Sequence, residues 1–151
     1  MKILLAIDGS TYSDAVVQEV IRRPWPGGSE VELFSAVYAP LDYVDPMMVS
    51  RDIHQRTLEK STERAKEFLG DAEKIIRKEA PQLAVTTKIV EGSARDAIVD
   101  EAAEWGADLI MLGSHGYGAA LRLLLGSVSH AVAQHAPCSV EIVRAHAERT
   151  D

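Results

Sequence analysis

The stretch "ADLIMLGSHGYGAALRLLLGSVSHAV", residues 107–132, decides how the rest of the chain is interpreted. Residues 107–113 are apolar almost throughout, which is typical of a strand buried on both faces. Residues 127–136, "SVSHAVAQHA", predict a helix. Four glycines lie at or after the end of the strand and before the helix. A connection with four glycines is conformationally free, which raises the question of what lies at the end of this strand.

The remaining sequence continues the same alternation of apolar strands and amphipathic helices. Strands are predicted at residues 2–7, 31–37, 83–92, 107–113 and 138–145, and helices at 10–23, 93–105, 127–136 and along an apolar face from Ala65 to Ile76. The order β-α-β-α-β-α-β-α-β predicts an α/β fold, with an open five-stranded parallel sheet and helices on both faces. No linker or repeat interrupts residues 1–151, so one domain is expected.

The polarity of the strands predicts their order in the sheet. The first and fourth strands are apolar and belong in the middle, whereas the third and fifth carry Lys88 and Glu141 and belong nearer the edges. With right-handed crossovers this gives the order 3-2-1-4-5. The winding then reverses between strands 1 and 4, at Asp8 and Gly113, where open α/β sheets bind ligands.

The glycines at this point are suited to an anion. Gly113 and Gly116 permit positive φ or close backbone approach, and the helix that starts after Gly126 offers unpaired N–H groups, with hydroxyls from Ser127 and Ser129. In the alternative interpretation the first two glycines only form a turn and Ser127 is an ordinary N-cap.

Better-known phosphate and nucleophile motifs do not fit this sequence. No G-x-x-x-x-G-K-[ST] occurs, Leu121 stands where a dinucleotide fingerprint needs its third glycine, and "GSVSH" is not a nucleophile elbow. A formal net charge of −7 argues against a nucleic-acid partner. The lone Cys138 favours a reducing compartment, and the short apolar run at the N-terminus favours a cytoplasmic protein without membrane association.

The chain resembles the universal stress protein domain along its whole length, through "ILLAIDGS" (3–10), "GADLIMLGSHG" (106–116) and "LLLGSVSHAVAQHAPCSVEIVR" (123–144). Gly113-x2-Gly116-x9-Gly126-Ser127 matches the G-2x-G-9x-G-(S/T) signature of the ATP-binding branch of that family. The resemblance implies a Rossmann-like, adenine nucleotide alpha hydrolase-like fold that binds ATP, with Mg²⁺ held by the phosphates.

The resemblance also implies where each part of ATP lies. Asp8 faces the adenosine, and Ala36 lines the adenine pocket. Gly113 and Gly116 run along the ribose and α-phosphate. The β- and γ-phosphates are held through backbone N–H and hydroxyl groups by Gly126, Ser127, Val128 and Ser129.

Several positions depart from the family pattern or stay open. Ala36 is smaller than the valine often found there, which leaves a looser adenine wall. The family often forms a homodimer through strand 5, where Glu141 replaces an aliphatic residue; a solvent-facing Glu141 would still allow this pairing. His115 is interpreted as a loop residue that uses its backbone N–H. Arg122 either reaches a phosphate or is a solvated charge, and the loop with Tyr43, Met47 and Met48 either covers a ligand, meets a subunit or packs on the surface.

The expected function is that of an ATP-binding, nucleotide-dependent stress sensor or regulator with at most slow hydrolysis, since the loop lacks the cationic clamp and metal-binding carboxylate of fast phosphoryl transfer. The alternative is a non-catalytic interaction module whose pocket is empty or binds AMP or cyclic AMP. A hydrolase that uses Ser127 or Ser129 is a third possibility.

Overall fold

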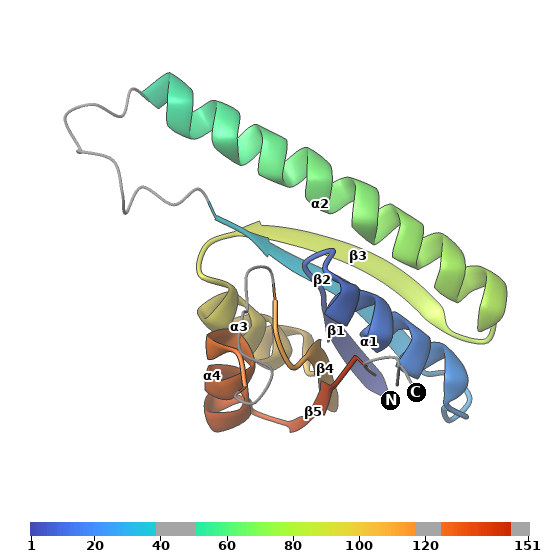
Figure 1. The fold of residues 1–151 in the computed structure, drawn as a ribbon. Helices are drawn as coiled ribbons and strands as arrows, with labels where there is room; N and C mark the ends of the chain where they lie inside the picture. Colours follow the sequence, from blue (N-terminus) through green and yellow to red (C-terminus); the bar gives the residue numbers. More distant parts are fainter. Residues whose placement is uncertain (39–50, 117–124, 146–151) are drawn as a thin grey trace, which may run out of the picture.

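The computed structural model describes residues 1–38, 51–116 and 125–145 (Figure 1). Arg122, Tyr43, Met47 and Met48 lie outside these residues. Strands and helices alternate as predicted, with bounds β1 Lys2–Ala6, α1 Thr11–Arg22, β2 Glu30–Val37, α2 Arg51–Glu79, β3 Ala84–Glu91, α3 Ala94–Trp105, β4 Leu109–Gly113, α4 Ser127–His135 and β5 Ser139–Val143. In the described part of the chain, no helix combines the length and apolarity needed to cross a membrane.

The five strands form one parallel sheet in the order β3-β2-β1-β4-β5, which confirms the prediction. β1 lies in the middle, where Ile3 is in register with Val31 on one side and Leu109 on the other. Ile3 is fully buried, as a central parallel strand covered on both faces requires. The carboxyl ends of β1 and β4 meet at the switch point.

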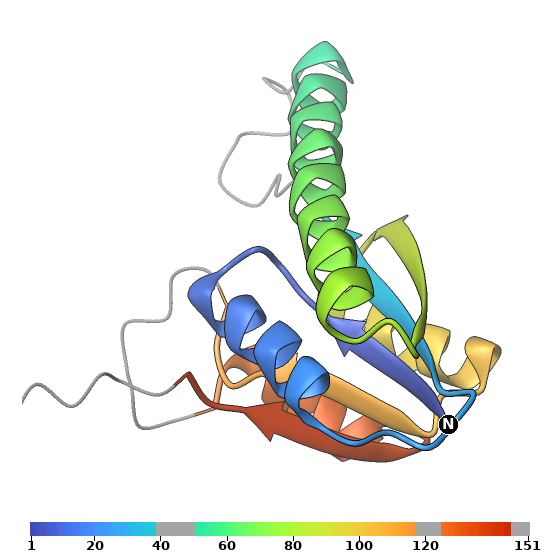
Figure 2. The same cartoon turned by 90° about the vertical axis from the view of Figure 1, so that its right-hand side faces the viewer.

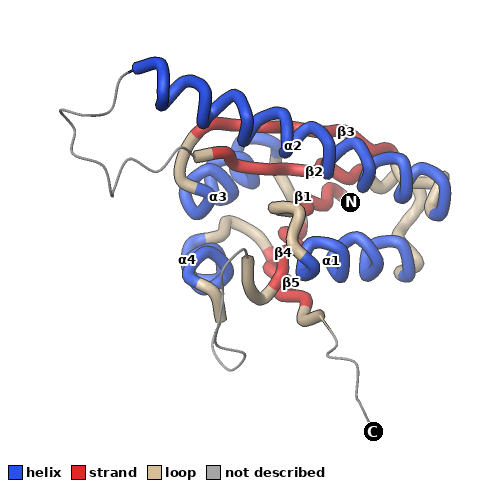
Figure 3. The backbone as a smooth tube through the Cα atoms, turned by 45° about the horizontal axis from the view of Figure 1, so that its top comes forward, coloured by secondary structure: helices blue, strands red, loops and turns tan. Residues whose placement is uncertain are grey.

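Helices cover both faces of the sheet (Figure 3). α1 and α2 pack on one face over a core that includes Leu5, Val16 and Leu69. α3 and α4 pack on the other face, over a core that includes Leu4, Ile98 and Val132. Neighbouring residues of β1 enter opposite cores because successive side chains of a strand alternate between the faces.

The long helix α2 positions one wall of the functional region. Its buried stripe contains Ala65, Leu69 and Ile76, and its N-terminal part extends past the carboxyl ends of β2 and β3 (Figures 1 and 2). Phe68 lies against Gly9, in the segment between β1 and α1: a Cβ built on Gly9 would stand 2.6 Å from the Phe68 ring. Gly9 has φ of +75°, so glycine is favoured there for two reasons.

Glu141 is paired with a residue of the α1 side of the sheet, so the solvent-facing arrangement that would allow strand pairing is not the one found. Its Oε2 accepts a 2.5 Å hydrogen bond from Nη1 of Arg23, the residue after α1, and its side chain is 27% exposed. The side chain therefore lies on the face that α1 covers. Because Arg23 also binds Glu19 at 2.8 Å, the charge of Glu141 is held in a network that joins α1 to β5.

Candidate functional site

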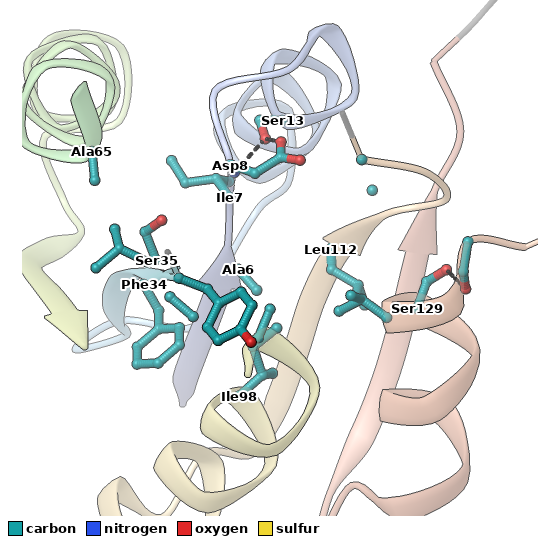
Figure 4. A pocket seen from close by; sticks show the side chains of 18 of the residues that line it. Ala6, Ile7, Asp8, Ser13, Phe34, Ser35, Ala65, Ile98, Leu112 and Ser129 are labelled. Atoms are coloured by element: carbon teal, nitrogen blue, oxygen red, sulfur yellow. Dashed lines mark hydrogen bonds between the residues drawn. The ribbon is translucent and has the colours of Figure 1, made fainter. Parts of the chain in front are cut away.

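A cavity of about 870 Å³ lies at the carboxyl ends of β1, β2 and β4 (Figure 4). This size is typical of small-molecule sites, and the position is the predicted switch point. The structure brings together, in the wall of this one cavity, every residue that the sequence singled out for binding, namely Asp8, Ala36, Gly113, Gly116, Gly126, Ser127, Val128 and Ser129.

The glycines of the signature permit close approach and do not supply positive φ. Among the described residues, positive φ occurs only at Gly9, Gly28, Gly92 and Gly106, so of the two uses that the sequence left open for Gly113 and Gly116, close approach is the one that the structure supports. A Cβ on Gly113 would stand 2.7 Å from Cβ of Tyr12 on α1. A Cβ on Gly116 would stand 2.7 Å from Oδ2 of Asp8. Gly113 therefore leaves room for Tyr12 of α1, and Gly116 leaves room for Asp8 in the cavity wall.

The first turn of α4 presents backbone N–H groups at the cavity wall. Gly126 is the N-cap and makes no side-chain cap, while its carbonyl accepts the first helical bond, from the N–H of His130 at 2.9 Å. The N–H groups of the three residues between them come before the first intrahelical bond and need another acceptor. Since the positive end of the helix dipole lies at the same place, this turn is suited to an anion.

The two serines of this turn have different surroundings. Ser127 is exposed, so its hydroxyl is accessible from the cavity. Ser129 is 2% exposed, and its hydroxyl donates to the carbonyl oxygens of Ser114 at 3.1 Å and Gly126 at 3.0 Å. Gly126 also donates its N–H to the Ser114 carbonyl at 2.8 Å. The Ser129 hydroxyl therefore joins α4 to the end of β4, and its backbone N–H is the group available to a ligand.

Asp8 is held in place by the start of α1 (Figure 4). Its Oδ1 accepts hydrogen bonds from the Ser10 N–H at 3.0 Å and the Ser13 hydroxyl at 2.8 Å, and Ser13 accepts the Asp8 N–H at 2.9 Å. Oδ2 is directed towards Gly116. A carboxylate with one oxygen fixed in this way is a positioned acceptor for donors in the cavity, such as ligand hydroxyls.

His115 also lines the cavity, and its side chain is fixed. Its Nδ1 lies 3.1 Å from the Ser114 hydroxyl, and its ring packs on Tyr12 with centroids 5.3 Å apart. Ser114 is 2% exposed, so this pair does not present an accessible nucleophile. The contact orients the histidine ring beside the glycines.

Sequence reasoning missed the wall that α2 contributes. Ser61, Arg64, Ala65 and Phe68 line the cavity, and Ala65 is seen opposite α4 in Figure 4. Their helical spacing was available as a signal, but nothing in the sequence links that helix face to a glycine loop more than 40 residues away. In the described residues no group of three or more His, Cys, Asp or Glu side chains could hold a metal ion.

Known proteins are similar to this chain in fold and in sequence. Residues 1–144 match the model of the universal stress protein family. The universal stress protein of Methanothermobacter thermautotrophicus is 31% identical over 144 residues, covering 95% of this chain and 94% of that protein. The structure of the hypothetical protein MJ0577 superposes with a TM-score of 0.82 at 26% identity, covering 96% of both chains.

Two further structures of the same fold contain nucleotides. A universal stress protein was solved in complex with cAMP, with a TM-score of 0.63, 23% identity and coverage of 95% of this chain and 96% of that one. An Arabidopsis thaliana protein of the family was solved with AMP bound, with a TM-score of 0.57, 17% identity and coverage of 100% and 95%. By its sequence match over residues 1–144, its relatives and its fold, this chain belongs to the universal stress protein family.

Proposed function

We propose that this chain binds ATP in the cavity at the carboxyl ends of β1, β2 and β4, and acts as a nucleotide-dependent regulator of a stress response in the cytoplasm. The observation that carries the proposal is the first turn of α4, whose N–H groups precede the first intrahelical bond and lie at the cavity wall together with Gly113 and Gly116. This arrangement binds phosphate without a lysine, by helix dipole and backbone donors.

The positions proposed for the other parts of the nucleotide follow from this phosphate site at the start of α4. The β- and γ-phosphates lie at Gly126 and at the N–H groups that follow it, and the α-phosphate and ribose lie along Gly113 and Gly116. A ribose hydroxyl donates to Asp8, and the base lies against Ala36. Glycine at position 116 lets the loop backbone lie close to the Asp8 carboxylate, since a Cβ there would stand 2.7 Å from Asp8 Oδ2.

Mg²⁺ accompanies the triphosphate in this proposal, held by phosphate oxygens and water. Asp8 is the acidic side chain that the described part of the wall contributes, and its Oδ1 is already bonded to Ser10 and Ser13. A cation that prefers six oxygen ligands would therefore take most of them from the ligand.

The described wall favours regulation over turnover. Fast phosphoryl transfer uses a cationic clamp and a metal-binding carboxylate at the γ-phosphate. Arg64, the one permanently cationic side chain in the described wall, is on α2, and α2 and α4 cover opposite faces of the sheet. A signal would pass to a second copy or another partner, and pairing of two copies along the β5 edge is part of the proposal.

Two relatives of the same fold solved with AMP or cAMP support a second candidate, in which a monophosphate is the ligand. The length of the phosphate chain separates the two candidates. If α4 holds the β- and γ-phosphates, ATP binds at least tenfold more tightly than AMP, whereas a monophosphate site shows no gain.

The experiment has two stages. Freshly purified protein is denatured, and the released small molecules are identified by chromatography and mass spectrometry; ATP or ADP near one per chain is expected. Calorimetric titration with ATP, ADP, AMP, cAMP and adenosine then measures the effect of phosphate length. Absence of any adenine compound, with no binding of added ATP, would refute the proposal, and ATP turnover near 10 per second would refute the regulatory role.

A further inference from the structure

Tyr38 stands at the mouth of the cavity with its side chain largely in solvent. It directly follows Val37, the last residue of β2, and it lines the cavity together with Ala36. Tyr38 is 53% exposed, whereas Phe34 of the same strand is 0% exposed and Val37 is 7% exposed. An aromatic ring that lines a concave site and is left half in water is a surface that a flat ligand can cover.

The alternation along β2 gives Tyr38 two neighbours on its own face. Phe34 and Ala36 both face the core under α3 and α4, and a strand period of two places Tyr38 next in this row. Residues two apart in a strand are separated by about 6.6–6.8 Å. Tyr38 therefore stands one such step beyond Ala36 along this row, so that a flat ligand on Ala36 would lie beside its ring.

The large side chain of Tyr38 can supply the contact with a base that the small side chain of Ala36 does not. With Ala36 as its only wall, the base would be held loosely. α3 contributes Ala94 and Ile98 to the same wall, and Ile98 is 4% exposed and belongs to the core cluster on which Ala36 packs (Figure 4). A base that lies on Ala36 and against Ile98 has one face left open, at the mouth where Tyr38 stands.

We propose that Tyr38 stacks on the adenine base and is the aromatic wall of the base pocket in this chain. The inference rests on the proposed function and adds a residue that fixes the class of ligand, a planar neutral heterocycle. Stacking requires only the ring, so the contribution of Tyr38 is equal for every ligand that carries the base and absent for the phosphates alone.

The test compares three variants by calorimetric titration with ATP, adenosine and inorganic tripolyphosphate. Tyr38→Ser removes the ring and should raise the Kd for ATP and adenosine by the same factor, about tenfold, with tripolyphosphate unchanged. Tyr38→Phe keeps the ring and should stay within about twofold of the wild type. Ile75→Ser, at a 42% exposed apolar residue of α2 outside the cavity wall, is the matched control and should change nothing.

A second readout observes the base directly, in the wild-type chain and in both Tyr38 variants. On binding to the wild-type chain, the adenine H2 and H8 signals should shift upfield in proton NMR because they enter the ring current of a stacked tyrosine, and this shift should be retained in Tyr38→Phe and lost in Tyr38→Ser.

The outcomes separate the inference from the function beneath it. If Tyr38→Ser bound both ATP and adenosine with the affinity of the wild type, the aromatic wall would be overturned and the proposed function would stand. A loss in Tyr38→Phe as large as in Tyr38→Ser would overturn stacking in favour of the hydroxyl. A wild-type chain that binds tripolyphosphate but not adenosine would overturn the base pocket, and one that binds no nucleotide would overturn both proposals.

Discussion

At the scale of single residues, Ser127 and Ser129 have the same side chain but different expected roles, the first in ligand binding and the second in stability. Ser127→Ala removes an exposed hydroxyl at the cavity wall and should weaken ATP binding about tenfold, the effect of one hydrogen bond to a charged group, with unchanged thermal stability. Ser129→Ala removes a buried hydroxyl that donates to Ser114 and Gly126, and should lower Tm by about 2–6 °C. Calorimetric titration and thermal unfolding of both variants measure the two effects.

The pair of serines also tests the hydrolase interpretation. If Ser127→Ala left ATP affinity unchanged and abolished a hydrolytic activity, Ser127 would be catalytic. Equal loss of Tm in both variants would show that the two hydroxyls have the same structural role, contrary to the hydrogen bonds in the structure.

At the scale of elements, the start of α4 is the part on which phosphate binding depends. A Cβ on Gly126 would stand 3.3 Å from the Ser114 carbonyl oxygen and 3.4 Å from Cα of His115. Gly126→Val therefore crowds the junction of β4 and the first turn of α4, to which the proposal assigns the phosphates, and it should reduce ATP affinity at least thirtyfold with adenosine affinity changed less than threefold. Titration with both ligands measures the ratio.

Gly27→Val is the matched control for this substitution. A Cβ on Gly27 would meet no atom within 4 Å, and Gly27 has no positive φ and lies outside the cavity wall. The control should bind both ligands as the wild type does. A folded Gly126→Val variant with wild-type ATP affinity would remove the α4 turn from the mechanism.

The helices and strands also show which parts of the fold could be predicted from the sequence. Strand order followed from polarity, because Lys88 and Glu141 excluded β3 and β5 from the middle of the sheet, and the switch point then located the cavity. The glycine spacing identified α4, although close approach and not positive φ explains these glycines. The partner of Glu141 could not be predicted, because Arg23 lies 118 residues away in the sequence and only the folded chain brings α1 over β5.

The wall from α2 could not be predicted for a related reason. Ser61, Ala65 and Phe68 form part of one helical stripe, and such a stripe looks the same whether it covers a core or the edge of a cavity. The distinction depends on how far α2 extends past β2, which is a property of the packed elements and not of the local sequence.

At the scale of the whole molecule, a buried acidic pair should make stability depend on pH. Glu32 on β2 is 7% exposed and Glu101 on α3 is 6% exposed. Lys88 pairs with Glu101, while Oε1 of Glu32 is buried without a hydrogen-bond partner among the described residues. Burial, and next the nearby Glu101, raise the pKa of Glu32 to about 7, against the opposing charges of Lys88 and Lys2.

The direction in which the free energy of unfolding changes with pH follows from which state, folded or unfolded, binds the proton of Glu32 more tightly. The unfolded carboxyl releases its proton near pH 4.5, and the folded one keeps it until about pH 7. Between these values the folded chain binds more protons, so the contribution of Glu32 to the free energy of unfolding is fully present below pH 4.5 and is lost as the pH rises through 7. At about 1.4 kcal/mol for each pH unit, the loss is at most about 3 kcal/mol.

Glu32→Gln replaces the carboxyl with a neutral group of the same shape and should remove this loss. Urea unfolding at pH 4.5, 6, 7 and 8 should show the variant equal to the wild type at the lowest pH and more stable by about 2 kcal/mol at pH 8. Lys88→Met should act in the opposite direction, because it leaves two buried carboxyls without their cation and so steepens the decline. Parallel curves for the wild type and Glu32→Gln would mean that Glu32 is ionised in the folded chain throughout this range, with Lys88 neutralising both carboxylates of the pair.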